Sequence, residues 1–343
     1  MAIDIQHRLG SATELTSITN DYFALDGGKA WDIYFTDSYG LNYFGKQKKG
    51  LYEKVPGGAY FQVPLEFGGL MGVAYPRGTI SINRTHSGYN KQIIKNARYS
   101  PTHYMGSAKV LRVDKLANRD KFAMVKDVVA RVKNAQKTLV RKQSTDFHGY
   151  GGTANVDTIN GTFEFCYNGD VSRTYPDANI GNLANTETGW TGRLTDRGAA
   201  TATLDDVRQM RLTAKVRDGK NGRPDIVFCS PAIFAVFQDI LQSQQRFVED
   251  KDAAAAGFQS ISLEGCTIIE DDFVNSSDVT NHAMVAINSA YYGIHCYEGA
   301  EYDKTDWTTE EATPGDMFMD IYWDGQVVSS MRDAHIGYHN VGV

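Results

Sequence analysis

Two stretches in the first third of the chain alternate between apolar and polar residues and are predicted to form β-strands. The first covers residues 59–67 and the second covers residues 90–113. The apolar positions of the first stretch are Phe61, Val63, Leu65 and Phe67. The segment between the two stretches is rich in residues that favour turns. We therefore expect a long β-hairpin with a turn-rich tip, and Pro64 restricts its first strand to a sheet edge or a bulge.

Residues 119–143 carry the pattern of a long amphipathic helix. Apolar residues recur at spacings of three and four and form one stripe, made of Val125, Val128, Val132, Ala135 and Leu139. Asn118 precedes this stretch and is expected to be the N-cap, while the turn HGYGG at residues 148–152 is expected to end the helix. At 1.5 Å per residue, such a helix is roughly 36 Å long.

The second half of the chain alternates between helix and strand patterns, which predicts a compact α/β unit. Thr203 and Asp206 have the spacing of a capping box at the start of a helix. Ser230 and Pro231 are expected to be the N-cap and the first residue of a second helix. The expected helices are 204–218 and 231–247, and the expected strand regions are 224–230, 261–272, 282–298 and 317–341. Residues 1–56 and 153–200 lack long periodicity and are expected to form an extended arm and a loop-rich stretch.

The charge distribution argues against a dedicated nucleic-acid-binding protein. The 343 residues carry a net charge of −6, whereas such proteins usually have a surplus of basic residues. The basic residues that gather on the long helix are Lys126, Arg131, Lys133, Lys137, Arg141 and Lys142. We interpret this run as a solvated helix face.

The cysteines and the N-terminus indicate the compartment. The four cysteines, none of them in a Cys-x-x-Cys pair, are Cys166, Cys229, Cys266 and Cys296. A structural zinc site is therefore not expected, and the last three are interpreted as small buried residues in a reducing cytoplasm. The first residues lack the layout of a signal peptide, and no run of about 18 apolar residues occurs, so no membrane contact is predicted.

The sequence contains none of the common catalytic motifs, and no enzymatic activity, cofactor or metal site is predicted. Three groups of residues leave an alternative open. The acidic cluster Glu270–Asp272 follows an apolar strand; it can act as an acid–base or cation site, or simply be the polar end of that strand. His335 and His339 would share one face of a strand, as a metal pair requires. Cys166 and His148 would act as nucleophile and base only if the fold brought them together.

Three segments of the later half carry a resemblance to a known family. They are GRPDIVFCSPAIFAVFQDILQSQQRF at 222–247, GFQSISLEGCTIIEDDFV at 257–274 and INSAYYGIHCYE at 287–298. In the first, a strand is followed by Ser-Pro and a helix that ends near Arg-Phe; in the second, Gly-Phe leads a strand, a glycine and an apolar run that ends in Asp. Together with the order of arm, hairpin, long helix and α/β unit, these segments resemble the Hong Kong 97-like capsid fold of tailed-bacteriophage major capsid proteins.

The resemblance implies an α+β fold with five parts. They are an N-terminal arm (1–57), an extended β-hairpin called the E-loop (58–113), a P-domain with a long spine helix (114–154), an α/β A-domain with part of the P-domain strands (155–320) and C-terminal P-domain strands (321–343). Contacts with neighbouring subunits are expected at the E-loop tip, from Leu70, Met71, Tyr75, Arg77 and Tyr89. Some family members cross-link an E-loop Lys to an Asn; Lys91, Lys95 and Asn340 offer these residue types here, but no cross-link is predicted.

The function implied by the resemblance is structural. Many copies would assemble as pentamers and hexamers into an icosahedral phage head in the virion, after assembly in the bacterial host cytoplasm. The implied partners are further copies of the chain, a separate scaffolding protein, a portal protein, weakly contacted double-stranded DNA inside the shell and a decoration protein. Two alternatives stay open: an encapsulin-type nanocompartment with an enzyme cargo, and an unrelated enzyme that uses the Glu270–Asp272 cluster.

Overall fold

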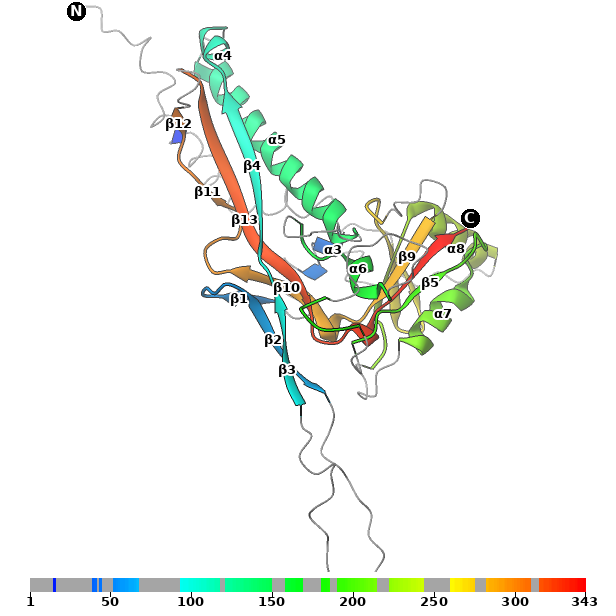
Figure 1. Cartoon of the computed structure of the whole chain (residues 1–343). Coiled ribbons are helices and arrows are strands. Elements are labelled where there is room, and N and C mark those ends of the chain that lie inside the picture. Colours follow the sequence, from blue (N-terminus) through cyan, green and yellow to red (C-terminus); the bar gives the residue numbers. More distant parts are fainter. Residues whose placement is uncertain are drawn as a thin grey trace, which may run out of the picture.

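The computed structural model contains an elongated sheet, a second sheet beside its lower end, and a hairpin that projects from that end (Figure 1). The residues that it describes are 15–16, 39–41, 43–44, 52–67, 93–117, 121–149, 158–168, 180–185, 190–214, 222–243, 260–274, 282–309 and 315–343. We call the first sheet with its long helix the elongated body, and the second sheet with its helices the α/β body. In the described part of the chain, no helix is long and apolar enough to cross a membrane.

One long strand organises the elongated body. Strand β13 (Met317–Ser329) pairs antiparallel with β4 (Thr102–Val110) along one part and with β10 (Tyr292–Tyr297) along the rest. Shorter strands complete the sheet: β1 (Glu53–Val55), β11 (Asp303–Lys304) and β12 (Thr308–Thr309). The chain leaves β4 through the short helix α4 (Arg112–Ala117) and returns along the sheet as helix α5 (Lys121–Phe147), as Figure 1 shows. The short helix α3 (Tyr39–Leu41) lies against α5.

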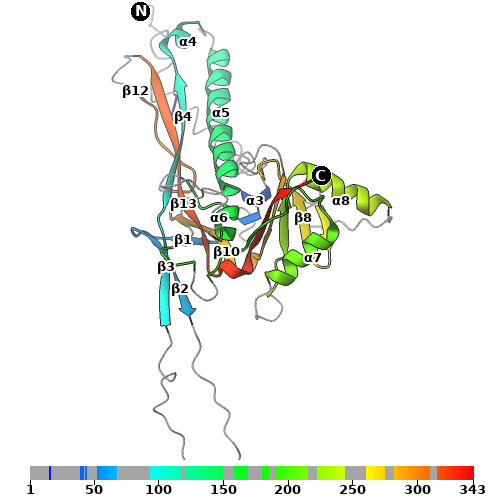
Figure 2. The same ribbon diagram turned by 45° about the vertical axis from the view of Figure 1, so that its right-hand side comes forward.

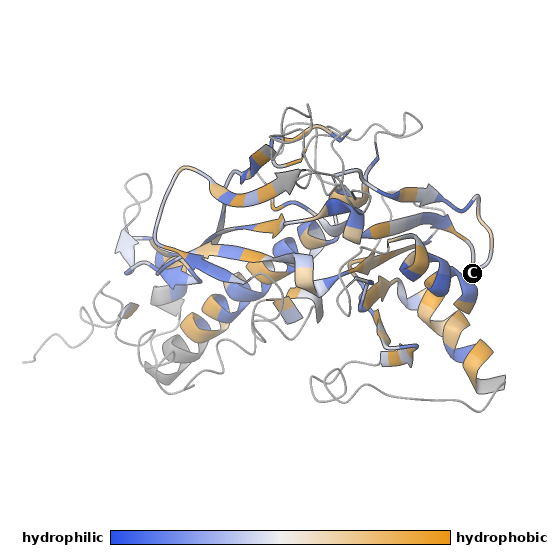
Figure 3. Cartoon of the chain, turned by 90° about the horizontal axis from the view of Figure 1, so that it is seen from below, coloured by the Kyte–Doolittle hydropathy of each residue, from blue (hydrophilic) through white to orange (hydrophobic). Residues whose placement is uncertain are grey.

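Strand β4 packs on α5 because its side chains alternate between buried and exposed along its whole length. At Gly106 the backbone of β4 lies so close to α5 that an added Cβ would be 3.0 Å from the carbonyl oxygen of Ala135. On α5, Val128, Val132 and Leu139 are buried, so this part of the predicted apolar stripe is the packing face. Hydrophobic and hydrophilic residues alternate along the long helix in the view from below (Figure 3).

The α/β body is a mixed sheet with helices on both faces (Figure 2). Its strands, in spatial order, are β5 (Leu194–Asp196), β14 (Ile336–Val341), β9 (His282–Ile287), β6 (Ile226–Cys229), β8 (Cys266–Glu270) and β7 (Ser260–Leu263). Helices α7 (Leu204–Thr213) and α8 (Pro231–Ser243) cover one face, and the short α6 (Thr162–Cys166) lies on the other with the end of α5. Two short 3₁₀ turns, Ser289–Tyr291 and Arg332–Ala334, connect strands.

The central strand β6 is buried on both faces and therefore serves two hydrophobic cores. Ile226 and Phe228 belong to the core that includes the end of α5, whereas Val227 and Cys229 belong to the core beneath α7 and α8. Because successive strand side chains point to opposite faces, one four-residue strand joins the packing of both bodies.

The projecting hairpin consists of β2 (Phe61–Phe67) and β3 (Ile93–Tyr99), and Figure 1 shows it leaving the elongated body. Pro64 lies in β2, which pairs only with β3 among the described residues, so the predicted edge position is confirmed. The prediction of one strand over residues 90–113 is wrong. This stretch breaks after Tyr99 at Ser100 and Pro101, and its second part, β4, pairs with β13 of the body instead.

Local chemistry explains where the predicted element ends were right and wrong. The capping box is confirmed, since Asp206 N donates to Thr203 Oγ1 and Thr203 N donates to the Asp206 carboxylate. Helix α7 ends at Thr213, one turn before the predicted end. The predicted strand 261–272 is two strands, because Glu264 and Gly265 both have positive φ and form a tight hairpin turn. Helix α5 continues past residue 143 to Phe147, up to the predicted turn.

Candidate functional site

The acidic cluster at the end of β8 is divided between the protein interior and the surface. Asp271 is buried, and its Oδ2 lies 3.1 Å from Nε2 of His148, the residue that follows α5. Its Oδ1 accepts a hydrogen bond from the backbone N of Phe273. Asp272 is exposed, and burial together with the charge of Asp272 raises the pKa of Glu270. The three carboxylates of this cluster thus do not face a common point.

His148 links three elements at the junction of the two bodies. Its Nε2 contacts Asp271 at the end of β8, and its Nδ1 lies 3.3 Å from Oγ1 of Thr162 in α6. The ring also packs edge-on against Phe147 and Phe228. This carboxylate–imidazole–hydroxyl series has the order of a nucleophilic triad, but all three side chains are buried in the interior. Because a substrate has no access to the hydroxyl, the arrangement holds the elements together.

The proposed pairing of Cys166 with His148 is not formed in the described structure, where His148 contacts Thr162 and Asp271 instead. Cys166 is fully buried, and burial raises the pKa of its thiol far above the ordinary value. All four cysteines are free and buried. Burial likewise raises the pKa of Cys229, Cys266 and Cys296, so these thiols stay protonated and unreactive at neutral pH.

His335 and His339 are both buried; His335 directly precedes β14, and His339 lies within it. His335 Nε2 lies 3.0 Å from Ser329 Oγ, and its Nδ1 accepts a hydrogen bond from the backbone N of Asn288. Burial, assisted by the charge of Arg332, lowers the pKa of His335 to about 3. Across the residues that the structure describes, no three His, Cys, Asp or Glu side chains form a metal-binding group.

Arg332 is a structural residue that the sequence patterns did not reveal. Its guanidinium is fully buried and donates to the carbonyl oxygens of Phe165 at 3.0 Å and Tyr167 at 2.6 Å, and to Oδ1 of Asn185 at 3.3 Å. Burial lowers its pKa to about 10, so it stays charged at neutral pH. It therefore fixes the C-terminal end of α6 to the turn before β14.

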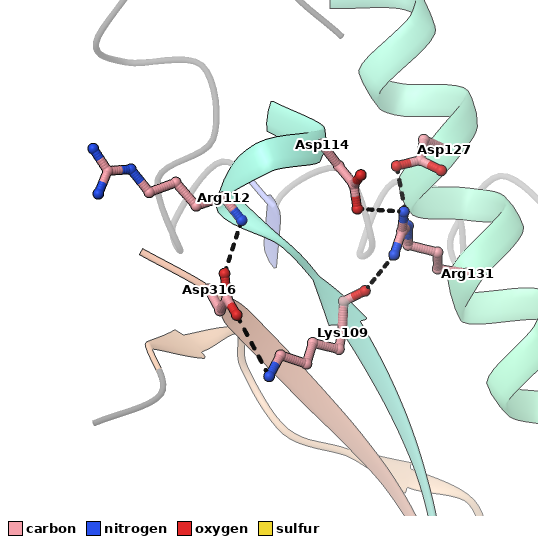
Figure 4. A network of polar contacts seen from close by, with 6 residues as sticks. All are labelled: Lys109, Arg112, Asp114, Asp127, Arg131 and Asp316. Atoms are coloured by element: carbon pink, nitrogen blue, oxygen red, sulfur yellow. Dashed lines mark hydrogen bonds and ion pairs between the residues drawn. The ribbon is translucent and has the colours of Figure 1, made fainter. Parts of the chain in front are cut away.

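The far end of the elongated body is held by a partly exposed polar network (Figure 4). Arg131 of α5 donates to Asp114 at 2.7 Å, to Asp127 at 3.0 Å and to the carbonyl oxygen of Lys109 at 2.9 Å. Asp316 accepts from the backbone N of Arg112 at 2.8 Å and pairs with the Lys109 ammonium at 3.5 Å. These contacts fix the turn between β4 and α5 to the start of β13.

The residues expected to contact neighbouring subunits, Leu70, Met71, Tyr75, Arg77 and Tyr89, lie outside the described residues. The same holds for Lys91 and for Asn118, the expected N-cap of α5. Ser230 does take the N-cap position of α8, since its carbonyl accepts from the backbone N of Phe234. Its buried hydroxyl has no hydrogen-bond partner among the described residues, so the expected side-chain cap is not formed.

No protein-family model matches the sequence, and no curated protein is significantly similar to it. The fold, in contrast, is similar to that of solved shell proteins. A chain of the cyanophage A-1(L) capsid asymmetric unit has 12% identity and a TM-score of 0.62 over 90% of this chain and 94% of that chain. A chain of the capsid of an empty GTA particle has 10% identity and a TM-score of 0.53, over 89% of this chain and 96% of that chain.

An encapsulin is similar as well. The holo-SrpI encapsulin complex from Synechococcus elongatus PCC 7942 has 11% identity and a TM-score of 0.52, over 87% of each chain. These three matches each span 87–90% of this chain. The chain therefore has the α+β Hong Kong 97-like fold that phage capsid and encapsulin shell proteins share.

Proposed function

We propose that this chain is the major capsid protein of a tailed double-stranded-DNA phage. Copies of it assemble as pentamers and hexamers into an icosahedral head. The observation that carries this proposal is the shape of the subunit together with its similarity, over 90% of its length, to a chain of the cyanophage A-1(L) capsid. One side of the hairpin stem is buried within the chain itself, at Phe61, Val63, Leu65, Ala97 and Tyr99, whereas Ile94 on the hairpin is exposed, and we expect neighbouring copies to cover such exposed positions.

The five parts implied by the sequence are assigned within this proposal. The hairpin β2–β3 is the stem of the E-loop (58–113), and α5 is the spine helix of the P-domain (114–154). Residues 155–320 are the A-domain with part of the P-domain strands and include most of the α/β body. Residues 321–343, the C-terminal P-domain strands, contain most of β13 and all of β14. Residues 1–57 are the N-terminal arm.

The partners follow from the same proposal. Each subunit contacts further copies of itself, and the E-loop tip residues Leu70, Met71, Tyr75, Arg77 and Tyr89 lie at such contacts. A scaffolding protein, a portal protein and a decoration protein are further partners, and double-stranded DNA is enclosed. The subunit acts in the virion after assembly in the host cytoplasm, and it has no enzymatic role. The burial of the His148 and Asp271 pair supports this last point.

Negative-stain electron microscopy of the purified chain, alone and with its scaffolding protein, tests the proposal. We expect shells, tubes or capsomers. Two exposed side chains give a matched pair of variants. Ile94, on the hairpin, is 64% exposed, and Leu212, on α7 of the α/β body, is 53% exposed. Ile94→Asp should reduce assembly, and Leu212→Asp should leave it unchanged. Persistent monomers of the unaltered chain under every condition would overturn the proposal.

An encapsulin-type shell is the second candidate, and its support is the similarity to the Synechococcus elongatus complex. The two functions differ in what the shell contains. Particles purified from the native source contain double-stranded DNA under the first proposal and a folded protein cargo under the second. Nuclease treatment after particle disruption, followed by protein gel analysis, separates the two outcomes.

A further inference from the structure

The base of the hairpin is held by both bodies of the subunit. On the side of the elongated body, the ring of Phe61 in β2 packs against the rings of His295 and Tyr297 in β10, with centroids 5.9 and 5.0 Å apart. On the side of the α/β body, the backbone N of Arg98 in β3 donates to the carbonyl oxygen of Gly181 at 2.9 Å. The chain path does not require this second attachment, because β2 follows β1 and β3 precedes β4, which are both strands of the elongated body.

The segment that contacts β3 comprises residues 180–185 and 190–192 of the described chain, and we call it the hairpin clamp. It leads into β5 of the α/β sheet. Within it, Oδ1 of Asn185 accepts hydrogen bonds from the backbone N of Gly192 at 2.8 Å and from the Arg332 guanidinium at 3.3 Å. The clamp is therefore fixed by the same buried guanidinium that holds the junction.

A buried tryptophan gives the clamp its shape. Trp190 is 1% exposed, and its Nε1 donates to the carbonyl oxygen of Ile180 at 3.0 Å, which brings the two parts of the clamp together. Next to Ile180, Gly181 has a φ of +65°, a conformation that glycine adopts readily. A Cβ added at Gly181 would be 3.1 Å from Cβ of Ala97 and 3.3 Å from Cζ of Tyr99. The clamp backbone thus contacts the buried side of β3 directly.

The two attachments lie on different strands of the hairpin and on different bodies. An isolated two-stranded hairpin is only marginally stable, so the contacts at its base decide where it points. Close-packed groups transmit small displacements to their neighbours. Because β2 rests on β10 and β3 rests on the clamp, the direction of the hairpin depends on the positions of both bodies.

We propose that the hairpin clamp sets the direction of the hairpin and transmits the position of the α/β body to it. When the α/β body shifts relative to the elongated body, the clamp carries β3 with it while β2 stays on β10, so the hairpin turns. The clamp is part of the single subunit. The inference therefore goes beyond the proposed function and does not depend on what the chain assembles into.

Distances between two spin labels on the full-length chain test the proposal. Ile94→Cys and Leu212→Cys place one label on the hairpin and one on α7, both at exposed positions, whereas the four native cysteines are buried and protected from the label. Double electron–electron resonance then measures the distribution of label distances. Labelled chain is mixed with an excess of unlabelled chain, so that pairs within one subunit dominate in any assembly. We expect one narrow distribution when the clamp is unaltered.

Two tryptophan variants separate the clamp from general stability. Trp190→Leu removes the hydrogen bond to Ile180, so the distance distribution should broaden or shift, and the amide of Arg98 should exchange with deuterium about tenfold faster. Trp307→Leu is the matched control. Trp307 is 2% exposed and lies between β11 and β12, at the end of the elongated body away from the hairpin (Figure 1). This control should leave both measurements unchanged, even where it lowers the free energy of unfolding.

Two glycine variants separate contact with the hairpin from backbone strain. Gly181 and Gly198 have φ angles of +65° and +58°, so alanine introduces similar strain at either position. An added Cβ at Gly181 meets Ala97, whereas no described atom lies within 4 Å of one at Gly198. Gly181→Ala should therefore shift or broaden the distance distribution, and Gly198→Ala should leave it unchanged.

Unchanged distributions in both clamp variants would overturn the inference. Equal changes in the clamp variants and their controls would overturn it as well, because the direction of the hairpin would then follow general stability. Circular dichroism checks that each variant is folded. If Trp190→Leu does not fold, the comparison of Gly181→Ala with Gly198→Ala decides alone.

Discussion

The junction between the two bodies is held by buried polar groups, whereas the far end of the elongated body is held by partly exposed ones. At the junction, the side chains of His148 and Asp271 are 0% and 1% exposed. At the far end of the elongated body, those of Arg131 and Asp114 are 32% and 30% exposed. Buried polar groups are costly to leave unpaired, and exposed ones exchange readily with water.

This difference assigns separate tasks to the two regions. The junction fixes one arrangement of α5, α6 and the α/β sheet, because any other arrangement would leave charges or carbonyl groups buried without partners. At the far end of the elongated body the ion pairs are partly exposed, so we expect small shifts there to cost little free energy. Such a division would suit the proposed function, in which one subunit fits non-identical neighbours. Substitutions in the two regions should differ in effect accordingly.

The largest effect is expected at Arg332. Arg332→Met removes the donors for the carbonyl oxygens of Phe165 and Tyr167, so it should lower the free energy of unfolding by roughly 3–5 kcal/mol. Chemical denaturation of the purified chain measures the change. Arg332→Lys keeps the charge but loses the planar fork, and an intermediate loss is expected. A Met variant as stable as the unaltered chain would show that the junction is not held by this group.

The next largest effect is expected for the pair of His148 and Asp271 at the end of α5. His148→Gln leaves the buried Asp271 carboxylate without its imidazole partner and should destabilise the chain by about 3 kcal/mol. Asp271→Asn should have a similar effect. A double-mutant cycle tests the pairing, because the two substitutions combined should cost much less than their sum. Strict additivity would mean that the residues act independently.

Several segments were predictable from local pattern, but the junction was not. The apolar spacing of α5 and the Thr203–Asp206 capping box are written within a few consecutive residues, so the sequence was enough to predict them. Arg332 instead reaches carbonyl groups of Phe165 and Tyr167, more than 160 positions earlier. No periodicity reports a pairing over such a distance.

The predicted element boundaries were wrong where a local turn changed the course of the backbone. The predicted strand 261–272 is split by a turn at Glu264 and Gly265, whose positive φ angles the alternation of residues does not reveal. In the acidic cluster, the sequence indicated Glu270–Asp272 as a unit. The fold instead buried Asp271 against His148, which contributes to the junction rather than to a site open to substrate.

The junction should also determine how stability depends on pH. The pKa of His335 is about 3 in the folded chain and 6.5 in the unfolded chain, so between these values only the unfolded state binds this proton. Stability should therefore fall as the pH drops from about 6.5 towards 3, by about 1.4 kcal/mol per unit from this group. Denaturation across this range should show a shallower dependence for His335→Gln, and an unchanged slope would contradict the assignment.

Alanine substitutions at two glycines test how closely the backbone is packed at the junction and in the elongated body. A Cβ at Gly161, at the junction, would overlap the carbonyl oxygen of Gly149, whereas one at Gly106, on β4, would lie 3.0 Å from that of Ala135. Gly161→Ala should destabilise by about 2–3 kcal/mol and Gly106→Ala by about 1 kcal/mol. Thermal unfolding of both variants measures the order. The reverse order would show that the elongated body, and not the junction, is the less tolerant region.

The smallest effect is expected at the network of Figure 4. Arg131→Met removes ion pairs with Asp114 and Asp127 that are about one third exposed, so the free energy of unfolding should fall by less than about 1 kcal/mol. Added salt should weaken this contribution further, whereas the effect of His148→Gln should hardly change with salt because its partner is buried. Urea denaturation at low and high salt compares the two variants directly. If Arg131→Met proved as damaging as His148→Gln, the far end of the elongated body would be held as firmly as the junction, and the difference between the two regions would not exist.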